Sequence, residues 1–166
     1  LGTWKGAVKV KSQTIYLFVS GSYAIKIVKV EVPEIIQYGV HDTVVLDCDY
    51  VYGNNTSGLV VKWFFRNKTR PVYQWIPSQK PQDMGILRGR VDLSYRVSND
   101  PYKMHRAVKI VKPGTDISGD YTCVVSTFLA EDQRTKQMIV FDVMITNNRG
   151  KITFAENFRY IKVIFN

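Results

Sequence analysis

The chain holds few side chains of the types that do covalent or metal chemistry. Its 166 residues include two cysteines, Cys48 and Cys123, and two histidines, His41 and His105. Neither histidine lies near a serine or cysteine partner in sequence, so we interpret both as surface residues. The sequence has no His-Glu-x-x-His motif and no glycine-rich phosphate loop. We therefore expect no catalytic residue, no metal site and no cofactor.

Paired carboxylates are the other candidates for acid–base chemistry. Asp47 and Asp49 flank Cys48, so in a strand both point away from the side that Cys48 faces. A solvated strand face explains this pair better than general acid–base work does. Glu131 and Asp132 are predicted to lie in a loop, as a solvated tip.

The charge pattern argues against a nucleic-acid partner, and the hydropathy argues against a membrane-spanning helix. The net charge of +9 comes from 23 basic and 14 acidic residues. Bases and acids alternate along the chain, and no cluster of lysine or arginine exceeds two in a row, so we expect no nucleic-acid partner. No run of 18 apolar residues occurs, so the sequence predicts no membrane-spanning helix.

From Ile25 to Phe141 the chain is a series of short runs in which apolar and polar residues alternate. Turn residues such as Gly53–Gly58 and 67–71 separate the runs, which recur about every ten residues. A period of two is typical of strands with one buried face, and no amphipathic helical stretch intervenes. This pattern predicts an all-β sandwich or barrel.

Four residues in these runs have a joint meaning in a two-sheet sandwich. Cys48 and Cys123 are 75 residues apart, Trp63 follows the first cysteine by 15, and Tyr121 precedes the second by two. The cysteines would bridge the sheets, the tryptophan would pack on the bridge, and the tyrosine would form a tyrosine corner. Such a disulfide stabilises the fold by about 4 kcal/mol in the chain-entropy model. The alternative is two free thiols and a core tryptophan.

Residues 60–65 (VVKWFF) and 118–123 (SGDYTC) resemble the C and F strands of the immunoglobulin superfamily. The long spacing between the cysteines is similar to that of its variable type, so the resemblance implies a variable-like sandwich over residues 25–141. The implied strands are A 25–32, B 43–50, C 59–66, C′ 72–76, D 89–95, E 104–111, F 120–127 and G 135–141.

A narrower resemblance rests on VKWF (61–64), VYQWIP (72–77) and DISGDYTC (116–123). These runs are similar to the first immunoglobulin domain of the insect beaten-path family, neuronal proteins that bind sidestep-type receptors of the same superfamily. Many such domains carry an acid six residues before the second cysteine, where this chain has Ile117, with Asp116 one earlier. The shift argues against the usual ion pair with the base of the D strand, here Arg90.

The resemblance points to strands G, F, C and C′, or to the loops at one end, as binding surfaces. Trp63 faces inward, so we expect Phe64 to point out, and Tyr73 and Trp75 to share one side of C′. If that side faces out, an aromatic patch forms, and Trp75→Ala weakens partner binding with little loss of folding. A register change of one residue would make them core instead. Phe128 and Leu129 extend the surface from the F–G loop. The basic residues beside it, Arg66, Lys68 and Arg70, favour an acidic partner surface or a proteoglycan.

Two features suggest an extracellular protein. Residues 9–24 have a basic flank, an apolar stretch and small residues before a cleavage point after Ala24, which resembles a secretory signal; the same stretch also alternates like a β-strand. Glycosylation sequons begin at Asn54, Asn55 and Asn67, all in predicted turns.

These inferences predict a signal-like segment at 1–24, the sandwich at 25–141 and a tail of unassigned structure at 142–166. The leading functional expectation is a secreted or cell-surface module that recognises a cell-surface protein, such as another receptor of the immunoglobulin superfamily. The alternative is a soluble immune-type binder of glycans or microbial surfaces, which would differ in losing affinity steeply with salt.

Overall fold

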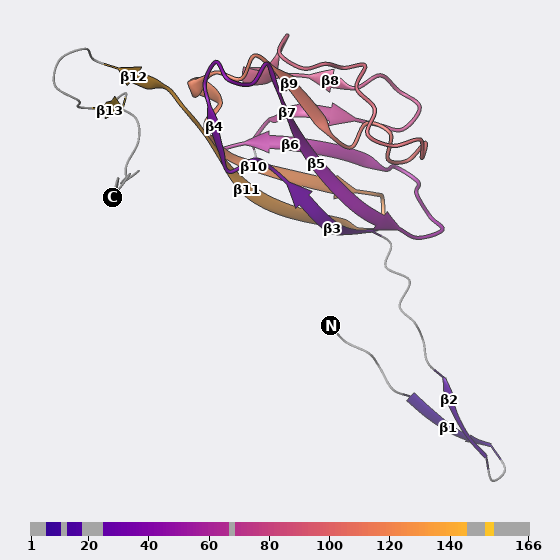
Figure 1. The fold of residues 1–166 in the computed structure, drawn as a ribbon. Coiled ribbons are helices and arrows are strands. Elements are labelled where there is room, and N and C mark those ends of the chain that lie inside the picture. The colour runs from indigo at the N-terminus through magenta and orange to yellow at the C-terminus, as the bar shows by residue number, and fades with distance from the viewer. Residues whose placement is uncertain (1–5, 11–12, 18–24, 67–68, 146–151, 155–166) are drawn as a thin grey trace.

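Two β-sheets pack face to face across residues 25–141 (Figure 1). The computed structural model describes residues 6–10, 13–17, 25–66, 69–145 and 152–154, with side chains from 25 to 66 and from 69 to 142. The smaller sheet has the order β3 (Ile25–Glu31), β5 (Thr43–Tyr52), β9 (Val108–Val111). The larger has the order β4 (Ile35–Gln37), β11 (Glu131–Phe141), β10 (Gly119–Ser126), β6 (Val60–Phe65), β7 (Pro71–Trp75), β8 (Gln82–Asp83). Two 3-10 turns, η1 (Gly85–Leu87) and η2 (Thr115–Ile117), lie between strands.

The core lies between the sheets because each central strand buries every second residue. On β5 the buried residues are Val44, Leu46, Cys48 and Tyr50, and the residues between them are partly exposed. The same alternation places Val61 and Trp63 of β6 inside. The alternation of apolar and polar residues in the sequence therefore matches the side chains that face the core.

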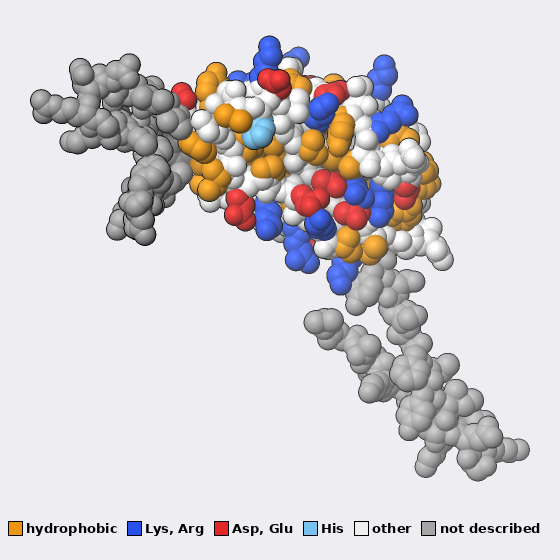
Figure 2. Space-filling model, viewed as in Figure 1, with side chains coloured by type: hydrophobic (Ala, Val, Ile, Leu, Met, Phe, Trp, Pro, Cys, Tyr) orange, Lys and Arg blue, Asp and Glu red, His pale blue; other side chains and the backbone are white. Residues whose placement is uncertain are grey.

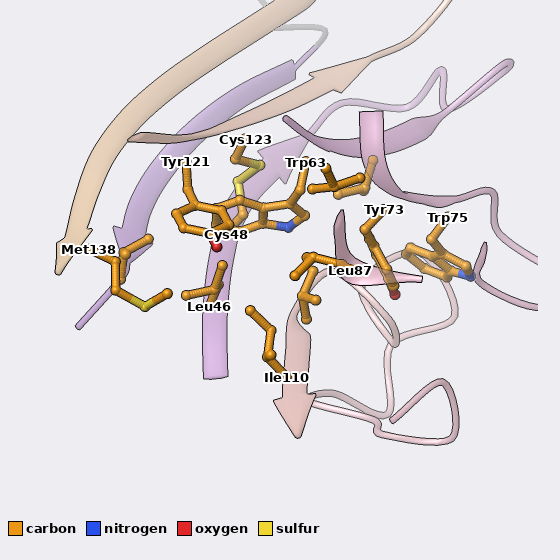
Figure 3. Close-up of a cluster of buried hydrophobic side chains, with 14 of the residues drawn as sticks. Leu46, Cys48, Trp63, Tyr73, Trp75, Leu87, Ile110, Tyr121, Cys123 and Met138 are labelled. Carbon is orange, nitrogen blue, oxygen red and sulfur yellow. A yellow bond between two sulfur atoms is a disulfide. The ribbon is translucent and has the colours of Figure 1, made fainter. Parts of the chain in front are cut away.

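The disulfide predicted between the sheets is confirmed, and the alternative of two free thiols is wrong. Cys48 and Cys123 are bonded, with their Cα atoms 6.4 Å apart. Trp63 pairs with Cys123 across the strands, is fully buried, and lies beside the bridge (Figure 3). The Tyr121 hydroxyl donates a hydrogen bond of 2.8 Å to the carbonyl of Ile117, which is the geometry of a tyrosine corner. The predicted all-β sandwich of two sheets is thereby confirmed.

The predicted D strand is wrong, and the E strand is shorter than expected. The 89–95 stretch meets β9 only around Val91, which bridges Ile110. There the Asp92 N–H donates to the Lys109 carbonyl and the Val111 N–H to the Arg90 carbonyl, both at 2.8 Å. β9 begins at Val108 rather than at 104. Side chains in this region satisfy nearby backbone groups: Asp100 Oδ1 accepts from the Tyr102 N–H at 2.8 Å, and Asp92 Oδ1 accepts from the Ser94 N–H at 3.1 Å. Such local turns compete with strand pairing.

The strand β11 begins earlier than predicted. It starts at Glu131, so Glu131 and Asp132 belong to the strand and not to a loop tip. Asp132 Oδ2 accepts a hydrogen bond of 2.8 Å from the Ile27 N–H of β3, which links the edges of the two sheets. The larger sheet also gains β4, which pairs with β11 in parallel, and the short β8.

The ion pair between Arg90 and Asp116 forms, against the expectation drawn from the shifted acid. The Arg90 Nη1 and Asp116 Oδ2 atoms are 2.6 Å apart. In η2 it is Ile117 that turns into the core, and Asp116 that remains exposed to meet the arginine. The 3-10 turn thus allows the ion pair to form although the acid lies one position earlier in the sequence than is usual.

Asp47 and Asp49 do not form a solvated face. Arg106 donates to both oxygens of Asp47, at 2.9 and 3.0 Å, and also binds Asp49. Lys103 Nζ lies 3.1 Å from Asp49. The long approach to β9 folds back over β5 and brings these cations to the carboxylates, so the four side chains hold that segment in place. Charges of both signs are interspersed on the face seen in Figure 2.

The two ends of the chain each contain a hairpin. β1 (Gly6–Val10) pairs with β2 (Gln13–Leu17), and β12 (Val143–Ile145) pairs with β13 (Ile152–Phe154). The predicted cleavage point after Ala24 lies outside the described residues, as do residues 146–151 and 155–166 of the tail. Across the described residues, no helix is long and apolar enough to span a membrane.

Candidate functional site

The expected aromatic patch on β7 is wrong. Tyr73 and Trp75 are each only 2% exposed. Tyr73 pairs with Trp63 and Trp75 pairs with Val61, and residues opposite each other in an antiparallel ladder share a face. Since Trp63 and Val61 point into the core, both β7 aromatics follow them. The expectation that Trp75→Ala causes little loss of folding is therefore also wrong, because Trp75 is a core residue.

Phe64 points outward as predicted but is half-buried. It pairs with Thr122 of β10, and Lys62 pairs with Val124, so the strands bring these side chains together on the outer face. Thr122 and Val124 are themselves buried there. The outer face of β6 and β10 is therefore covered by its own side chains.

The most exposed large hydrophobic side chains of the described chain are Phe128 and Leu129, at 82% and 73%. They form the tip of the β10–β11 turn, which we call the apolar apex. Thr127 closes this turn: its backbone N–H donates to the Ala130 carbonyl at 2.8 Å, and its hydroxyl oxygen accepts from the Ala130 N–H at 3.1 Å. The apolar apex therefore stands on a tight, hydrogen-bonded turn.

The apolar apex is also braced by the loop between β5 and β6. The Phe128 N–H donates a hydrogen bond of 3.1 Å to the Ser57 carbonyl. The Phe128 ring lies against Gly58, where a Cβ would come within 2.4 Å of a ring carbon. Gly58 also has a φ of +71°, which other residues rarely adopt. Two loops far apart in sequence thus fix one side chain.

Strand register places the apolar apex at one end of the sandwich with two further turns. Ser126 pairs with Val60, and Val61 pairs with Trp75, so the end of β10, the start of β6 and the end of β7 lie together. Exposed Asn54 and Asn55 lie in the β5–β6 loop at this end, where Asn55 Oδ1 accepts from the Ser57 N–H at 3.0 Å.

The basic residues expected beside Phe64 lie far from the apolar apex. Arg66 follows the far end of β6, and its Nη2 donates to the Ser118 carbonyl at 2.9 Å. Arg70 precedes β7 on the same side, and Lys68 and Asn67 lie outside the described residues. These cations are therefore at the opposite end of β6 from the apolar apex.

The two histidines have different environments. His41 is exposed, as predicted. His105 is half-buried: its Nδ1 lies 2.7 Å from the Tyr95 carbonyl, and its ring meets Trp75 edge-on at 5.7 Å between centroids. The surface interpretation is thus wrong for His105, whose contacts hold two loops together. Among the described residues, no group of three or more His, Cys, Asp or Glu side chains is arranged to hold a metal ion.

The bridged sheets, buried tryptophan and tyrosine corner define an immunoglobulin-type sandwich of variable class. The family model described as the Immunoglobulin domain matches residues 37–136, and the chain belongs to this family. Domains of the family are typically extracellular recognition modules rather than enzymes.

Solved structures agree with the fold. The human B7-H4 IgV-like domain is 15% identical with a TM-score of 0.51, over 71% of this chain and 98% of that one. Bovine butyrophilin is 22% identical with a TM-score of 0.50, over 72% of this chain and 59% of that one. The tandem V-type regions of VCBP3, a v-region-containing chitin binding protein, are 16% identical with a TM-score of 0.50, over 70% and 50%. At these identities the likeness concerns the fold. No curated protein matches the chain.

Proposed function

We propose that this chain is an extracellular recognition module that binds a cell-surface protein through its apolar apex. The observation that carries the proposal is the exposure of Phe128 and Leu129 on a turn held by backbone hydrogen bonds. Large apolar side chains in water are a cost to a soluble domain unless a partner covers them, and aromatic anchors dominate many interfaces. A braced turn also loses little conformational entropy on binding.

The partner that we propose is another receptor of the immunoglobulin superfamily. The likeness of residues 61–64, 72–77 and 116–123 to the beaten-path family supports this choice. The burial of Tyr73 and Trp75 moves the proposed contact from the C′ strand to the F–G turn, where Phe128 and Leu129 lie.

The test is a binding screen of the secreted chain against an array of receptor ectodomains. The double variant Phe128→Ser, Leu129→Ser is expected to lower affinity for the partner at least about tenfold, because interface anchors typically contribute 2 kcal/mol or more. Its melting temperature should change little, since both side chains are largely exposed and Phe128 packs only against Gly58. Ile35→Ser, Val40→Ser is the matched control, because it removes two exposed apolar side chains at the opposite end of the sandwich. Equal loss in both double variants would refute the apolar apex as the contact.

The alternative is a soluble binder of glycans or microbial surfaces. The V-type fold shared with VCBP3, whose description includes chitin binding, favours it, as does the net charge of +9. A binder led by charge loses affinity steeply between low and physiological salt, whereas an apolar contact does not. A salt titration of any interaction found in the screen separates the two.

Secretion and glycosylation are part of the proposal. Asn54 and Asn55 are exposed in the loop beside the apolar apex, which leaves an acceptor accessible, and Asn67 is a further candidate. We expect a chain expressed through a secretory cell line to begin at Ile25, to carry glycan, and after deglycosylation to weigh two hydrogens less than its reduced form. Intact mass measurement without reductant checks all three. A retained, unmodified chain beginning at Leu1 would contradict the extracellular proposal.

A further inference from the structure

A hollow of about 630 Å³ opens at the end of β7, separate from the apolar apex. Three stretches build it: the turn after Trp75 with Ser78–Pro81, the segment 93–96, and the segment 101–105 before β9. Its volume falls in the range of sites that hold small ligands or a few residues of a peptide.

The walls of the hollow are held in place by hydrogen bonds between its segments. The Val97 N–H donates to the Met104 carbonyl at 3.0 Å, and His105 Nδ1 contacts the Tyr95 carbonyl at 2.7 Å. The Gln79 N–H donates to the Ile76 carbonyl at 3.0 Å and closes the turn after β7. The site is therefore largely formed before any ligand arrives.

The charge of the hollow is entirely positive. Lys80 and Arg96 line it, both are exposed, and no acid is among the lining residues. Neither cation pairs with an acid within the described part of the chain. The nearby acids are engaged elsewhere: Asp92 binds Ser94 and Lys109, and Asp100 binds the Tyr52 hydroxyl. The chemistry offered to a ligand is that of two cations with no internal counter-charge.

The rest of the lining is largely apolar, and one of its side chains, Trp75, carries an unpaired buried nitrogen. Leu93, Pro101 and Met104 present hydrocarbon to the hollow, and Trp75, only 2% exposed, also lines it. Trp75 Nε1 is the one buried side-chain nitrogen or oxygen of the described residues that lacks a hydrogen-bond partner. Figure 3 shows this nitrogen on the edge of the ring turned away from Tyr73 and Leu87. The nitrogen itself is buried, so a ligand in the hollow would act on its N–H signal through the Trp75 ring and not by direct contact.

We propose that this hollow binds an acidic side chain of a protein partner, with its carboxylate paired to Lys80 and Arg96. The apolar residue next to that acid packs on Leu93, Pro101 and Met104. The hollow lies at the end of the sandwich that carries the apolar apex, because Val61 pairs with Trp75 and Val60 pairs with Ser126. A single partner surface can therefore cover both. The inference rests on the proposed function in taking the ligand to be a protein.

The test uses the full chain labelled with ¹⁵N and the peptide acetyl-Leu-Glu-Leu-amide. The uncharged control peptide is acetyl-Leu-Gln-Leu-amide. The indole N–H signal of Trp75, assigned with Trp75→Phe, reports binding at the hollow. We expect the Glu peptide to shift this signal saturably and the Gln peptide to bind at least about tenfold more weakly, because a charge-assisted hydrogen bond is lost.

Matched charge variants localise the effect. Lys80→Gln, Arg96→Gln should lower affinity for the Glu peptide about tenfold, to that of the Gln peptide. Arg134→Gln, Lys136→Gln removes the same charge from exposed positions on β11 and should leave the affinity unchanged. The proposal is overturned if the peptides bind equally, if both double variants behave alike, or if no saturable shift occurs below about 10 mM. Glucuronic acid is titrated in parallel, and binding of this sugar without binding of the peptide would overturn the proposal in favour of an acidic glycan.

The outcome is distinguishable from failure of the proposed function. Phe128→Ser, Leu129→Ser should leave peptide binding unchanged, because neither residue lines the hollow. Peptide binding without any receptor found through the apolar apex would remove only the earlier proposal. A receptor that depends on the apolar apex, with no peptide binding, would remove only this one.

Discussion

Trp63 and Trp75 are both core tryptophans, but only Trp63 has a hydrogen-bond partner for its indole nitrogen. Trp63 Nε1 donates a hydrogen bond of 3.2 Å to the Arg106 carbonyl. Trp75 Nε1 has no partner among the described residues. The two indoles lie on the same face of neighbouring strands and are buried to nearly the same extent, so this difference can be measured.

We expect Trp63→Phe to destabilise the domain by about 1 kcal/mol more than Trp75→Phe, because only the first loses a hydrogen bond and leaves a carbonyl unpaired. Both are compared by the free energy of unfolding in denaturant. Trp75→Ala should cost about 3–5 kcal/mol, since it opens a cavity in the core. If Trp75→Phe proved the costlier of the two phenylalanine variants, the indole N–H of Trp75 would have to be satisfied in solution.

Two turns hold glycines with the same backbone requirement and different neighbours. Gly58 and Gly39 have φ angles of +71° and +76°. A Cβ at Gly58 would strike the Phe128 ring at 2.4 Å, whereas a Cβ at Gly39 would meet nothing within 4 Å. Comparing substitutions at these two glycines therefore distinguishes the effect of backbone strain from the effect of displacing the apolar apex.

Gly58→Ala and Gly39→Ala are each expected to cost about 1 kcal/mol of stability from the positive φ alone. Only Gly58→Ala should also move Phe128, which the chemical shifts of its ring protons would show, and lower affinity for the partner. Denaturation midpoints and binding are measured on both variants. Unchanged Phe128 signals in Gly58→Ala would mean that the loop does not brace the apolar apex.

The stability of the whole sandwich is tied to three buried tyrosines on three strands. Tyr50, Tyr73 and Tyr121 each donate their hydroxyl proton to a backbone carbonyl, of Tyr102, His105 and Ile117 respectively. Burial is the main cause that raises the pKa of all three hydroxyls above the usual value for tyrosine. The folded state therefore favours the protonated phenols.

Because these pKa values are raised in the folded state, the domain should lose stability at alkaline pH. A raised pKa in the folded state gives stability that is fully present below the pKa of the unfolded chain, about 10, and is lost as the pH rises above it. We expect the free energy of unfolding to fall by up to about 1.4 kcal/mol per pH unit for each buried tyrosine. Tyrosinate absorbance and circular dichroism are followed together during an alkaline titration. The last tyrosines should ionise only as the fold is lost; ionisation of all 10 tyrosines in an intact fold would contradict this.

The all-β class, the inward faces of the central strands and the disulfide could all be predicted from the amino-acid sequence. These features follow from local rules, because alternation with a period of two sets which residues of β5 and β6 face inward. The spacing of Cys48, Trp63, Tyr121 and Cys123 is then similar to that of a variable-type sandwich. None of this needs the partner of each strand to be known.

Which side of β7 faces inward could be read only from the folded chain, since that depends on the register of β7 with β6. The fold likewise replaced the D strand with local turns around Asp92 and Asp100, and it paired Arg90 with Asp116 through η2. The brace of Phe128 on Gly58 and the hollow at the end of β7 join segments that are distant in sequence. Contacts between distant segments depend on how the strands pair and the loops close, which no local pattern encodes.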